Sequence, residues 1–272
     1  MTEPLTVGTA RFDATDLVAV PGRSGEYTVD LDGAWMSLVA IHGGYMVALA
    51  TRAAEAAVPG RAVRTVATSF IRRGNPGLAR LVVEPVRHGR TIAQVKVDLV
   101  QDDDIVLGCR ITMADPGLRS EPLDDPSPLA LPPPKACVTA VPPNAPNHFT
   151  RAEGLLDPSS TPFSQGPELV SRGYIRPRLG EPDAAWLTMA CDWFPPPAFV
   201  RLTPPVGGVS VDMVTHIHRP NTPPGDWLAG WFELESGHDG LAVERGRITT
   251  LDGRPVAESV QTRLLVGERR VD

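Results

Sequence analysis

The sequence predicts an α+β protein in which one unit, a helix followed by antiparallel strands, is present twice. Two stretches with the composition or the apolar spacing of a helix lie at residues 42–60 and 182–194. Each stretch is followed by four β-rich runs that are separated by turn-like residues. Because the order of elements is the same on both sides of a proline-rich segment, the chain is interpreted as a duplicated unit.

The first helix is predicted over "HGGYMVALATRAAEAAVPG", residues 42–60. Ala, Leu and Met, which are good helix formers, fill this stretch, and Pro59-Gly60 ends it. Turn-like residues separate the β-rich runs that follow. They are "GNPG" at 74–77, His88-Gly89 and the three aspartates at 102–104. The runs lie at residues 64–74, 78–89, 90–101 and 104–114.

The second helix is predicted over "PDAAWLTMACDWF", with its start at Pro182-Asp183. Its apolar residues recur at helical spacing: Trp186, Met189, Ala190 and Trp193. The stretches "SFIRRGNPG" and "THIHRPNTPPG" hold the same place in the two halves, so that Arg72 corresponds to Arg219. The β-rich runs of this half lie at residues 208–220, 226–237, 241–253 and 254–267.

Proline dominates residues 116–160, which rules out a regular helix or a central strand and predicts an extended linker. The expected division of the chain is therefore an N-terminal unit at 1–115, a linker at 116–160 and a C-terminal unit at 161–272.

Composition narrows the classes of function. The net charge of −6 argues against a nucleic-acid partner held by bulk charge. No apolar run reaches the roughly 18 residues of a membrane span, and residues 1–16 show no secretory signal. The three cysteines are widely spaced, which predicts no disulfide framework and favours a reduced, cytoplasmic setting.

Asp192 is the one charged residue in the apolar stretch "LTMACDWFPPPAF", residues 187–199. An ionised carboxylate in such surroundings is costly unless it is paired or used. On a helical wheel Asp192 lies off the apolar face, so a solvent-exposed or arginine-paired aspartate is the alternative to a functional one. The stretch by itself leaves both interpretations open.

The start of the first helix is the second candidate. Glycine pairs at this position are commonly structural, but Gly43 and Gly44 also permit close approach of a ligand to the backbone. The amides of Gly44 and Tyr45 are expected to be unpaired at the positive end of the helix dipole, which suits an oxyanion hole. His42 is expected to cap the helix, with ligand contact as the alternative.

Five stretches resemble the acyl-CoA thioesterase II family and its thioesterase-like relatives. They are "HGGYMVALATRAAEAAVP", "SFIRRGN", "ACDWFPPPAF", "GVSVDMVTHIHRP" and "AESVQTRLLV". The resemblance covers nearly the whole chain and thins in the linker and at the N-terminus. It implies a double hotdog, in which each of two tandem units has a helix wrapped by an antiparallel sheet.

The resemblance also implies a site. The family's catalytic aspartate, threonine and glutamine, which surround a water molecule, fall on Asp192, Ser210 and Gln261. Serine keeps the hydroxyl but lacks the methyl that restricts the rotamer of threonine. The implied activity is hydrolysis of an acyl-CoA or related acyl thioester, in a homo-oligomer, with no cofactor and no metal.

Elementary chemistry agrees with these roles. Asp192 can take a proton from water as a general base or attack directly, and its apolar neighbours are expected to raise its pKa. Ser210 and Gln261 can orient the water without adding charge.

One working site per chain is expected. Hotdog units pair so that the start of one helix faces the middle of the other, and superposition of the helix starts sets Gly43 against Asp183 and Arg52 against Asp192. The glycine pair then meets Asp192, whereas the start of the second helix meets Arg52. The second location lacks both the glycines and the acid.

Two alternatives to the thioesterase remain open. A hotdog hydratase or dehydratase usually shows a GDxNPxH-like stretch, whereas this chain has "RRGNPG". A non-catalytic acyl-thioester binding protein stays open because of Ser210. A serine hydrolase is disfavoured because GxSxG is absent, and His216 with His218 makes a poor metal site without a third ligand.

Overall fold

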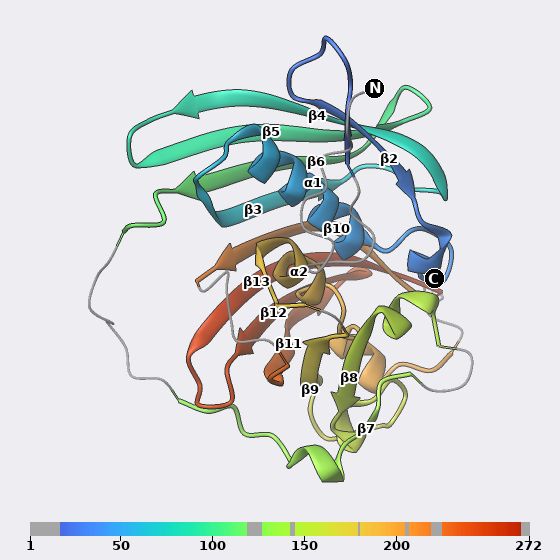
Figure 1. Cartoon of the computed structure of the whole chain (residues 1–272). Coiled ribbons are helices and arrows are strands. Elements are labelled where there is room, and N and C mark those ends of the chain that lie inside the picture. The colour runs from blue at the N-terminus through green and yellow to red at the C-terminus, as the bar shows by residue number, and fades with distance from the viewer. Residues whose placement is uncertain are drawn as a thin grey trace.

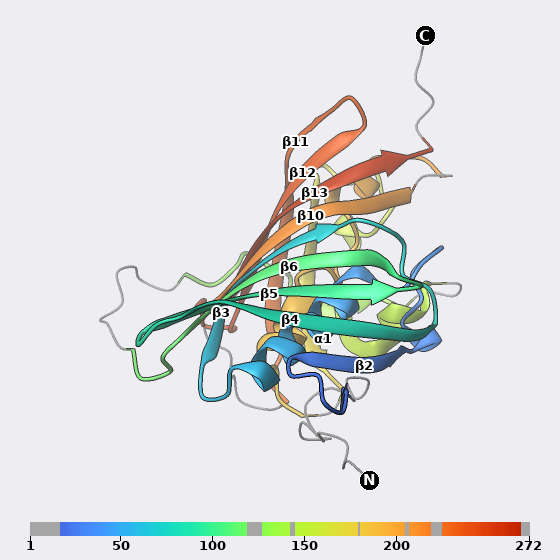
Figure 2. The same cartoon turned by 90° about the horizontal axis from the view of Figure 1, so that it is seen from above.

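The computed structural model describes residues 17–118, 127–141, 145–178, 180–204, 207–218 and 225–267. In these residues thirteen antiparallel strands form one sheet, in the order β1-β2-β4-β5-β6-β3-β10-β13-β12-β11-β9-β8-β7. The sheet curves around two α-helices that pack against each other (Figures 1 and 2). The predicted α+β class is therefore confirmed.

The described elements of the first half are β1 (Val18–Ala19), β2 (Glu26–Leu31), η1 (Gly33–Trp35), α1 (Gly43–Ala57), β3 (Ala62–Phe70), β4 (Gly77–His88), β5 (Ile92–Gln101) and β6 (Asp104–Ala114). Those that follow are η2 (Pro134–Ala136), β7 (Val138–Thr139), η3 (Asn147–Arg151), β8 (Ala152–Leu156), η4 (Pro158–Ser160), β9 (Val170–Pro177), α2 (Ala184–Ala190), η5 (Pro197–Val200), β10 (Gly207–Ile217), β11 (Leu228–His238), β12 (Leu241–Thr249) and β13 (Pro255–Val266). Both predicted helices and all eight predicted strands are present.

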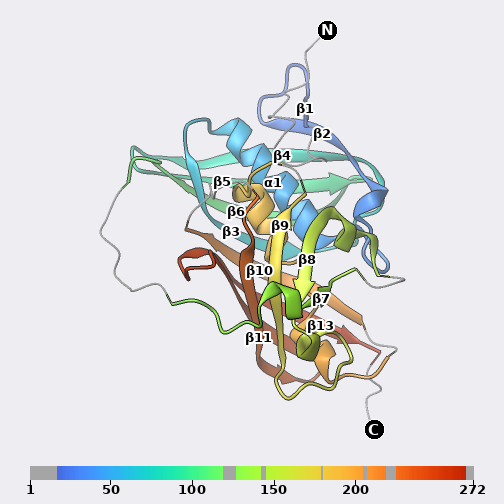
Figure 3. The same ribbon diagram turned by 60° about the horizontal axis from the view of Figure 1, so that its bottom comes forward.

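The seam between the two halves is the pairing of β3 with β10. Their register runs from Asp212 opposite Ser69 to His216 opposite Thr65. Since β13 pairs with the other edge of β10, the last strand of the chain lies close to the first half. The two helices lie side by side across this seam (Figure 3).

Helix α1 is buried on nearly every side, because strands of the first half wrap it and α2 covers what remains. Small residues such as Ala48, Ala50 and Ala53 let the strands approach its backbone closely. His42 caps its start by accepting a hydrogen bond from the Tyr45 amide, as the sequence predicts. A helix that is apolar almost all round is the pattern expected for a central core helix.

Helix α2 is shorter than the predicted 182–194 and ends at Ala190. The residues that follow Asp192, Trp193 and Phe194, are buried, and their rings pack against the strands. An added Cβ at Gly154 of β8 would overlap the ring of Trp193, and one at Gly230 of β11 would overlap the ring of Phe194. The glycines of these strands thus make room for large side chains that follow the helix.

The segment expected to be an extended linker contributes to the sheet. Five residues of it form β8, which pairs with β9 from Ala152 opposite Pro177 onward. This stretch is free of proline, so its amides are available for the ladder. Residues 119–126 and 142–144 of the segment lie outside the described residues, as do residues 1–16 and Arg219. The predicted division into these three segments, with its two boundaries, stays a prediction.

Gly154→Ala is expected to lower the free energy of unfolding by about 1–3 kcal/mol, because the new methyl overlaps the Trp193 ring. Gly33→Ala is the matched control, since an added Cβ there would lie 3.6 Å from its nearest neighbour. Urea denaturation of the two variants and the wild type measures the difference. Equal stability of both variants would contradict the packing described for Trp193.

Candidate active site

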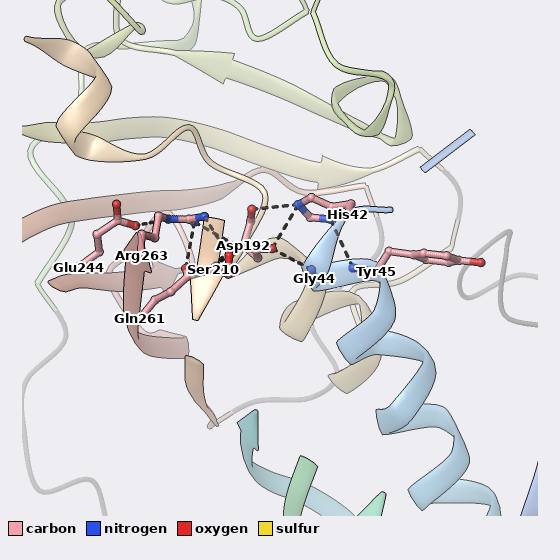
Figure 4. Close-up of polar contacts among 8 residues, drawn as sticks. All are labelled: His42, Gly44, Tyr45, Asp192, Ser210, Glu244, Gln261 and Arg263. Carbon is pink, nitrogen blue, oxygen red and sulfur yellow. Dashed lines mark hydrogen bonds and ion pairs between the residues drawn. The ribbon is translucent and has the colours of Figure 1, made fainter. Parts of the chain in front are cut away.

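Asp192 lies in the turn that follows α2, directly after the C-cap residue Cys191. Its side chain is 3% exposed, and its carboxylate faces the start of α1. The Gly44 amide donates a hydrogen bond to Asp192 Oδ2 over 2.8 Å (Figure 4). The acid of the second half therefore meets the helix start of the first half, as the pairing of two hotdog units predicts.

The glycine pair is what allows this approach. An added Cβ at Gly44 would lie 2.8 Å from the Met189 carbonyl oxygen and 2.9 Å from Asp192 Cβ. One at Gly43 would lie 2.8 Å from the ring of Phe70 and 3.0 Å from Asp192 Oδ2. Gly44 therefore has no room for a side chain, because a backbone oxygen lies in the way, whereas a side chain at Gly43 would have to displace the ring of Phe70.

The other carboxylate oxygen, Oδ1, meets the remaining residues of the predicted set. Gln261 Nε2 donates to Oδ1 over 2.8 Å and to Ser210 Oγ over 2.7 Å. Ser210 Oγ makes a longer contact of 3.5 Å with Oδ1. A register shift between Ser210 and Asp212 interrupts the pairing of β10 with β13 at this point. Such bulges commonly redirect a side chain towards a site.

Two further buried residues complete the network, and sequence reasoning missed both. Arg263 of β13 donates from Nη2 to Asp192 Oδ1 over 3.0 Å and from Nε to Glu244 Oε2 over 2.7 Å. The signal that could have found them is strand periodicity. Gln261 and Arg263 are two residues apart and share a face, and Glu244 lies opposite Gln261 in register on β12.

The pKa of Asp192 is lowered, and the expected increase is wrong. Burial alone would raise the pKa of this carboxyl. The opposing effects prevail; in decreasing order they come from the charge of Arg263, from His42, and from hydrogen bonds donated by Gln261 and Gly44. The carboxylate is therefore ionised in its resting state despite its burial.

His42 joins the helix start to the acid. The Tyr45 amide donates to His42 Nδ1 over 3.3 Å, so the proton of a neutral ring lies on Nε2. Nε2 is 3.0 Å from the Asp192 carbonyl oxygen and 3.4 Å from Oδ2. Burial lowers the pKa of His42, which keeps the ring neutral. The ring of His148, from the expected linker, stacks on it with centroids 4.3 Å apart.

The expectation of two unpaired amides at the start of α1 is wrong. The Gly44 amide is bonded to Asp192 and the Tyr45 amide to His42. A helix start this deeply buried must satisfy its donors, and here the acid itself does so. A substrate carbonyl therefore has to replace Asp192 Oδ2 at the Gly44 amide in order to bind there.

The corresponding location at the start of α2 is closed by an ion pair. Arg52 Nη2 donates to Asp183 Oδ2 over 2.5 Å, and the Arg52 side chain is 2% exposed. The other carboxylate oxygen of Asp183 caps α2 by accepting from the Trp186 amide. The sequence superposition that opposed Arg52 to this helix start is thus reproduced in space.

Other candidate sites are absent from the described residues. They include no group of three or more His, Cys, Asp or Glu side chains that could hold a metal ion. His216 and His218 of the described chain are exposed, and His218 contacts Glu258 instead. No helix in the described ranges is long and apolar enough to cross a membrane.

Comparison with known sequences identifies the family. A family model for the acyl-CoA thioesterase N-terminal domain matches residues 31–114, and one for the acyl-CoA thioesterase C-terminal domain matches residues 124–265. The chain belongs to the acyl-CoA thioesterase family. It is therefore a thioester hydrolase, as the resemblance implies. No curated protein matches it.

Solved structures share the fold. A candidate thioesterase II from Thermobifida fusca is 23% identical with a TM-score of 0.82, over 93% of this chain and 96% of that one. A hot dog protein of unknown function from Alicyclobacillus acidocaldarius is 20% identical with a TM-score of 0.83, over 94% and 98%. An acyl-CoA thioesterase II from Mycobacterium marinum is 19% identical with a TM-score of 0.73, over 92% and 96%. The predicted double hotdog is confirmed.

Arg52→Met is expected to lower the free energy of unfolding by about 3–5 kcal/mol, because it leaves the buried Asp183 carboxylate without its partner. Adding Asp183→Asn should recover part of the loss, since asparagine still caps the helix. Urea denaturation measures the stability of both variants.

The number of working sites can be counted by binding. Titration of the wild type with a non-hydrolysable thioester analogue should give one bound molecule per chain, and two per chain would contradict a single site.

Proposed function

We propose that the chain hydrolyses acyl-CoA to a free acid and CoA with a water molecule activated by Asp192. The observation that carries this proposal is the buried Asp192 carboxylate between the two halves. One of its oxygens lies at a helix start and the other lies at Gln261 and Ser210. An ionised carboxylate beside two neutral polar groups and a helix dipole suits activation of water and stabilisation of an oxyanion.

Substrate binding begins with an exchange at the Gly44 amide. The thioester carbonyl oxygen accepts the hydrogen bond that Asp192 Oδ2 holds in the resting state. Oδ1 keeps its hydrogen bonds from Gln261 and Arg263 during this exchange. The carboxylate therefore rotates while Oδ1 remains in place. The released Oδ2 then becomes available to a water molecule beside the carbonyl carbon.

Hydrolysis follows in two steps. The water oxygen adds to the carbonyl carbon while its proton passes to Asp192, and the resulting oxyanion is held by the Gly44 amide. The tetrahedral intermediate then collapses, the carbon–sulfur bond breaks, and the CoA thiolate takes the proton from Asp192. The acid and CoA leave, and the carboxylate of Asp192 returns to the Gly44 amide.

Ser210 and Gln261 orient the water in different ways. Ser210 Oγ accepts from Gln261 Nε2 and from Arg263 Nη1 over 3.1 Å, so its hydroxyl can serve the water only as a donor. In the resting state this proton is directed to Asp192 Oδ1 over a long 3.5 Å, and the water takes it over when it binds. A water that accepts this bond directs its own protons towards Asp192. Gln261 uses both amide protons, on Asp192 and Ser210, and so fixes the positions of the two groups that touch the water.

One observation favours a second candidate, which is binding of an acyl thioester without turnover. The lowered pKa of Asp192 makes its carboxylate a weaker base than an isolated aspartate. Tight binding of one acyl-CoA with no release of thiol would support this candidate. The stretch "RRGNPG", which lacks the Asp and the His of a GDxNPxH-like stretch, counts against the hydratase or dehydratase alternative.

The setting of the enzyme is also a proposal. All three cysteines are free, which supports a reduced, cytoplasmic environment. Homo-oligomeric assembly stays a prediction.

The decisive test is thiol release from acyl-CoA substrates of short to long chain, with the wild type and Asp192→Asn. The wild type should turn over at least one substrate. The asparagine variant should lose about 10²–10⁴-fold in kcat, because the amide keeps the volume but cannot accept the proton. Asp157→Asn is the matched control, since Asp157 is also a buried carboxylate bonded to an arginine, Arg172. Near wild-type turnover by Asp192→Asn would remove Asp192 from the mechanism.

The pH profile of kcat/KM tests the charge state of the free enzyme. Asp192 must be ionised, and its pKa lies below the ordinary 3.8, so activity is retained above that value and lost only as the pH falls through it. We expect a constant kcat/KM from about pH 7 down to about pH 5. Circular dichroism at each pH shows that the protein remains folded. A fall centred near pH 6.5, the ordinary pKa of histidine, would contradict the lowered pKa of His42 if Asp192→Asn or a histidine variant traced it to that ring, and the lowered pKa of Asp192 if it belonged to the carboxyl.

A further inference from the structure

Arg263 lies between two buried carboxylates. Its Nη2 donates to Asp192 Oδ1 over 3.0 Å and to Gln261 Oε1 over 3.0 Å, and its Nη1 donates to Ser210 Oγ over 3.1 Å. Its Nε donates to Glu244 Oε2 over 2.7 Å. The guanidinium thus contacts every polar group that has been assigned to the water, although Arg263 is not among the residues that the sequence predicts for the site (Figure 4).

These contacts fix one end of the acid. Arg263 and Gln261 both hold Asp192 Oδ1, whereas Oδ2 is held by a single backbone amide and by the more distant ring of His42. When a carbonyl oxygen displaces Oδ2, the carboxylate remains anchored through Oδ1. A planar guanidinium with several donors is well suited to this task, because it fixes direction as well as charge.

Glu244 has no other described role than to hold Arg263. Its side chain is 3% exposed, and its second oxygen, Oε1, has no partner among the described residues. Burial raises the pKa of Glu244, although the charge of Arg263 opposes this increase. A half-satisfied buried carboxylate costs stability, so its presence calls for a function beyond folding.

The groups that face Asp192 come from five elements. His42 lies at the start of α1, His148 on η3, Ser210 on β10, Glu244 on β12, and Gln261 and Arg263 on β13. Burial keeps both histidines neutral, since it lowers the pKa of His42 and brings that of His148 well below its ordinary value. Among these groups Arg263 is the one that carries a positive charge.

We propose that Arg263 is a positioning residue of the active site, which holds Asp192 as the anion and anchors Oδ1, and that Glu244 holds Arg263 in place. This inference rests on the proposed function for its catalytic consequence, but its effect on Asp192 can be measured without turnover.

The test uses the full chain with Arg263→Met, Arg263→Lys and Glu244→Gln. Two quantities are followed against pH: kcat/KM, and the side-chain carboxyl carbon resonance of Asp192, assigned by its absence in Asp192→Asn. Arg263→Met should raise the midpoint of both titrations by about one pH unit or more, since it removes the opposite charge. Arg263→Lys should return the midpoint towards wild type but leave kcat low, because a point charge does not anchor Oδ1.

Glu244→Gln should shift the midpoint in the opposite direction, to lower pH, because the neighbouring negative charge is lost while an acceptor for Arg263 Nε remains. The double variant Arg263→Met/Glu244→Gln contains one buried carboxylate fewer, and it replaces Arg263→Met if that variant does not fold. Its midpoint should also lie above that of the wild type. Arg172→Met is the matched control, since Arg172 also bridges two carboxylates, those of Asp157 and Glu168, and it should leave the Asp192 titration unmoved.

The outcomes separate the two proposals. If Arg263→Met or the folded double variant titrates like the wild type, the inference is overturned whether or not the enzyme is active. If the resonance shifts as expected while the wild type hydrolyses no acyl-CoA, the positioning role stands and the proposed hydrolysis fails. A midpoint shift of the same size in Arg172→Met would show a general effect of lost stability and would also overturn the inference.

Discussion

The arrangement of the two halves at the site depends on a single hydrogen bond, which the Gly44 amide donates to the Asp192 carboxylate. It joins the first turn of α1 to the turn after α2, 148 residues further along the chain. The bond requires glycine at position 44 and is favoured by glycine at position 43, and the second helix ends before Asp192. The seam between β3 and β10 brings the strands that carry Ser210 and Gln261 to the same place. A buried donor and a buried acceptor satisfy each other, and a substrate can compete for that donor.

The electrostatics of the two helix starts differ in kind. Asp192, Glu244 and Arg263 form a buried group of two carboxyl groups and one guanidinium, beside two histidines whose pKa values are lowered by burial. At the other helix start one cation and one anion close directly on each other. The first arrangement keeps a carboxylate that can exchange partners, whereas the second has no group left to exchange. The two halves thus offer two corresponding locations, and an ion pair occupies one of them.

The sequence predicts the parts of this structure that local periodicity encodes. Both helices and the eight strands β3–β6 and β10–β13 follow from composition and turn residues, and the meeting of Asp192 with the Gly43-Gly44 pair follows from the superposition of helix starts. The sequence does not predict strands β8 and β9. Strand β8 has five residues and follows the proline-rich segment, and β9 contains both glycine and proline. The helical wheel could not place Asp192, since α2 ends two residues earlier. The sequence predicts the wrong direction for the pKa of Asp192. Its apolar neighbours are adjacent in sequence, whereas Arg263, whose charge lowers the pKa, is 71 residues away.

The ends of the sheet limit how copies of the chain can associate. The edge strands of the described sheet, β1 and β7, have two residues each, while the strands inside it have up to twelve. Edges this short offer few free backbone groups as a template for another strand, which is a common protection against aggregation. The two described edges therefore disfavour growth by strand addition. Side chains on the outer surface of the described sheet and in its loops are then the larger surface that copies of the chain could share.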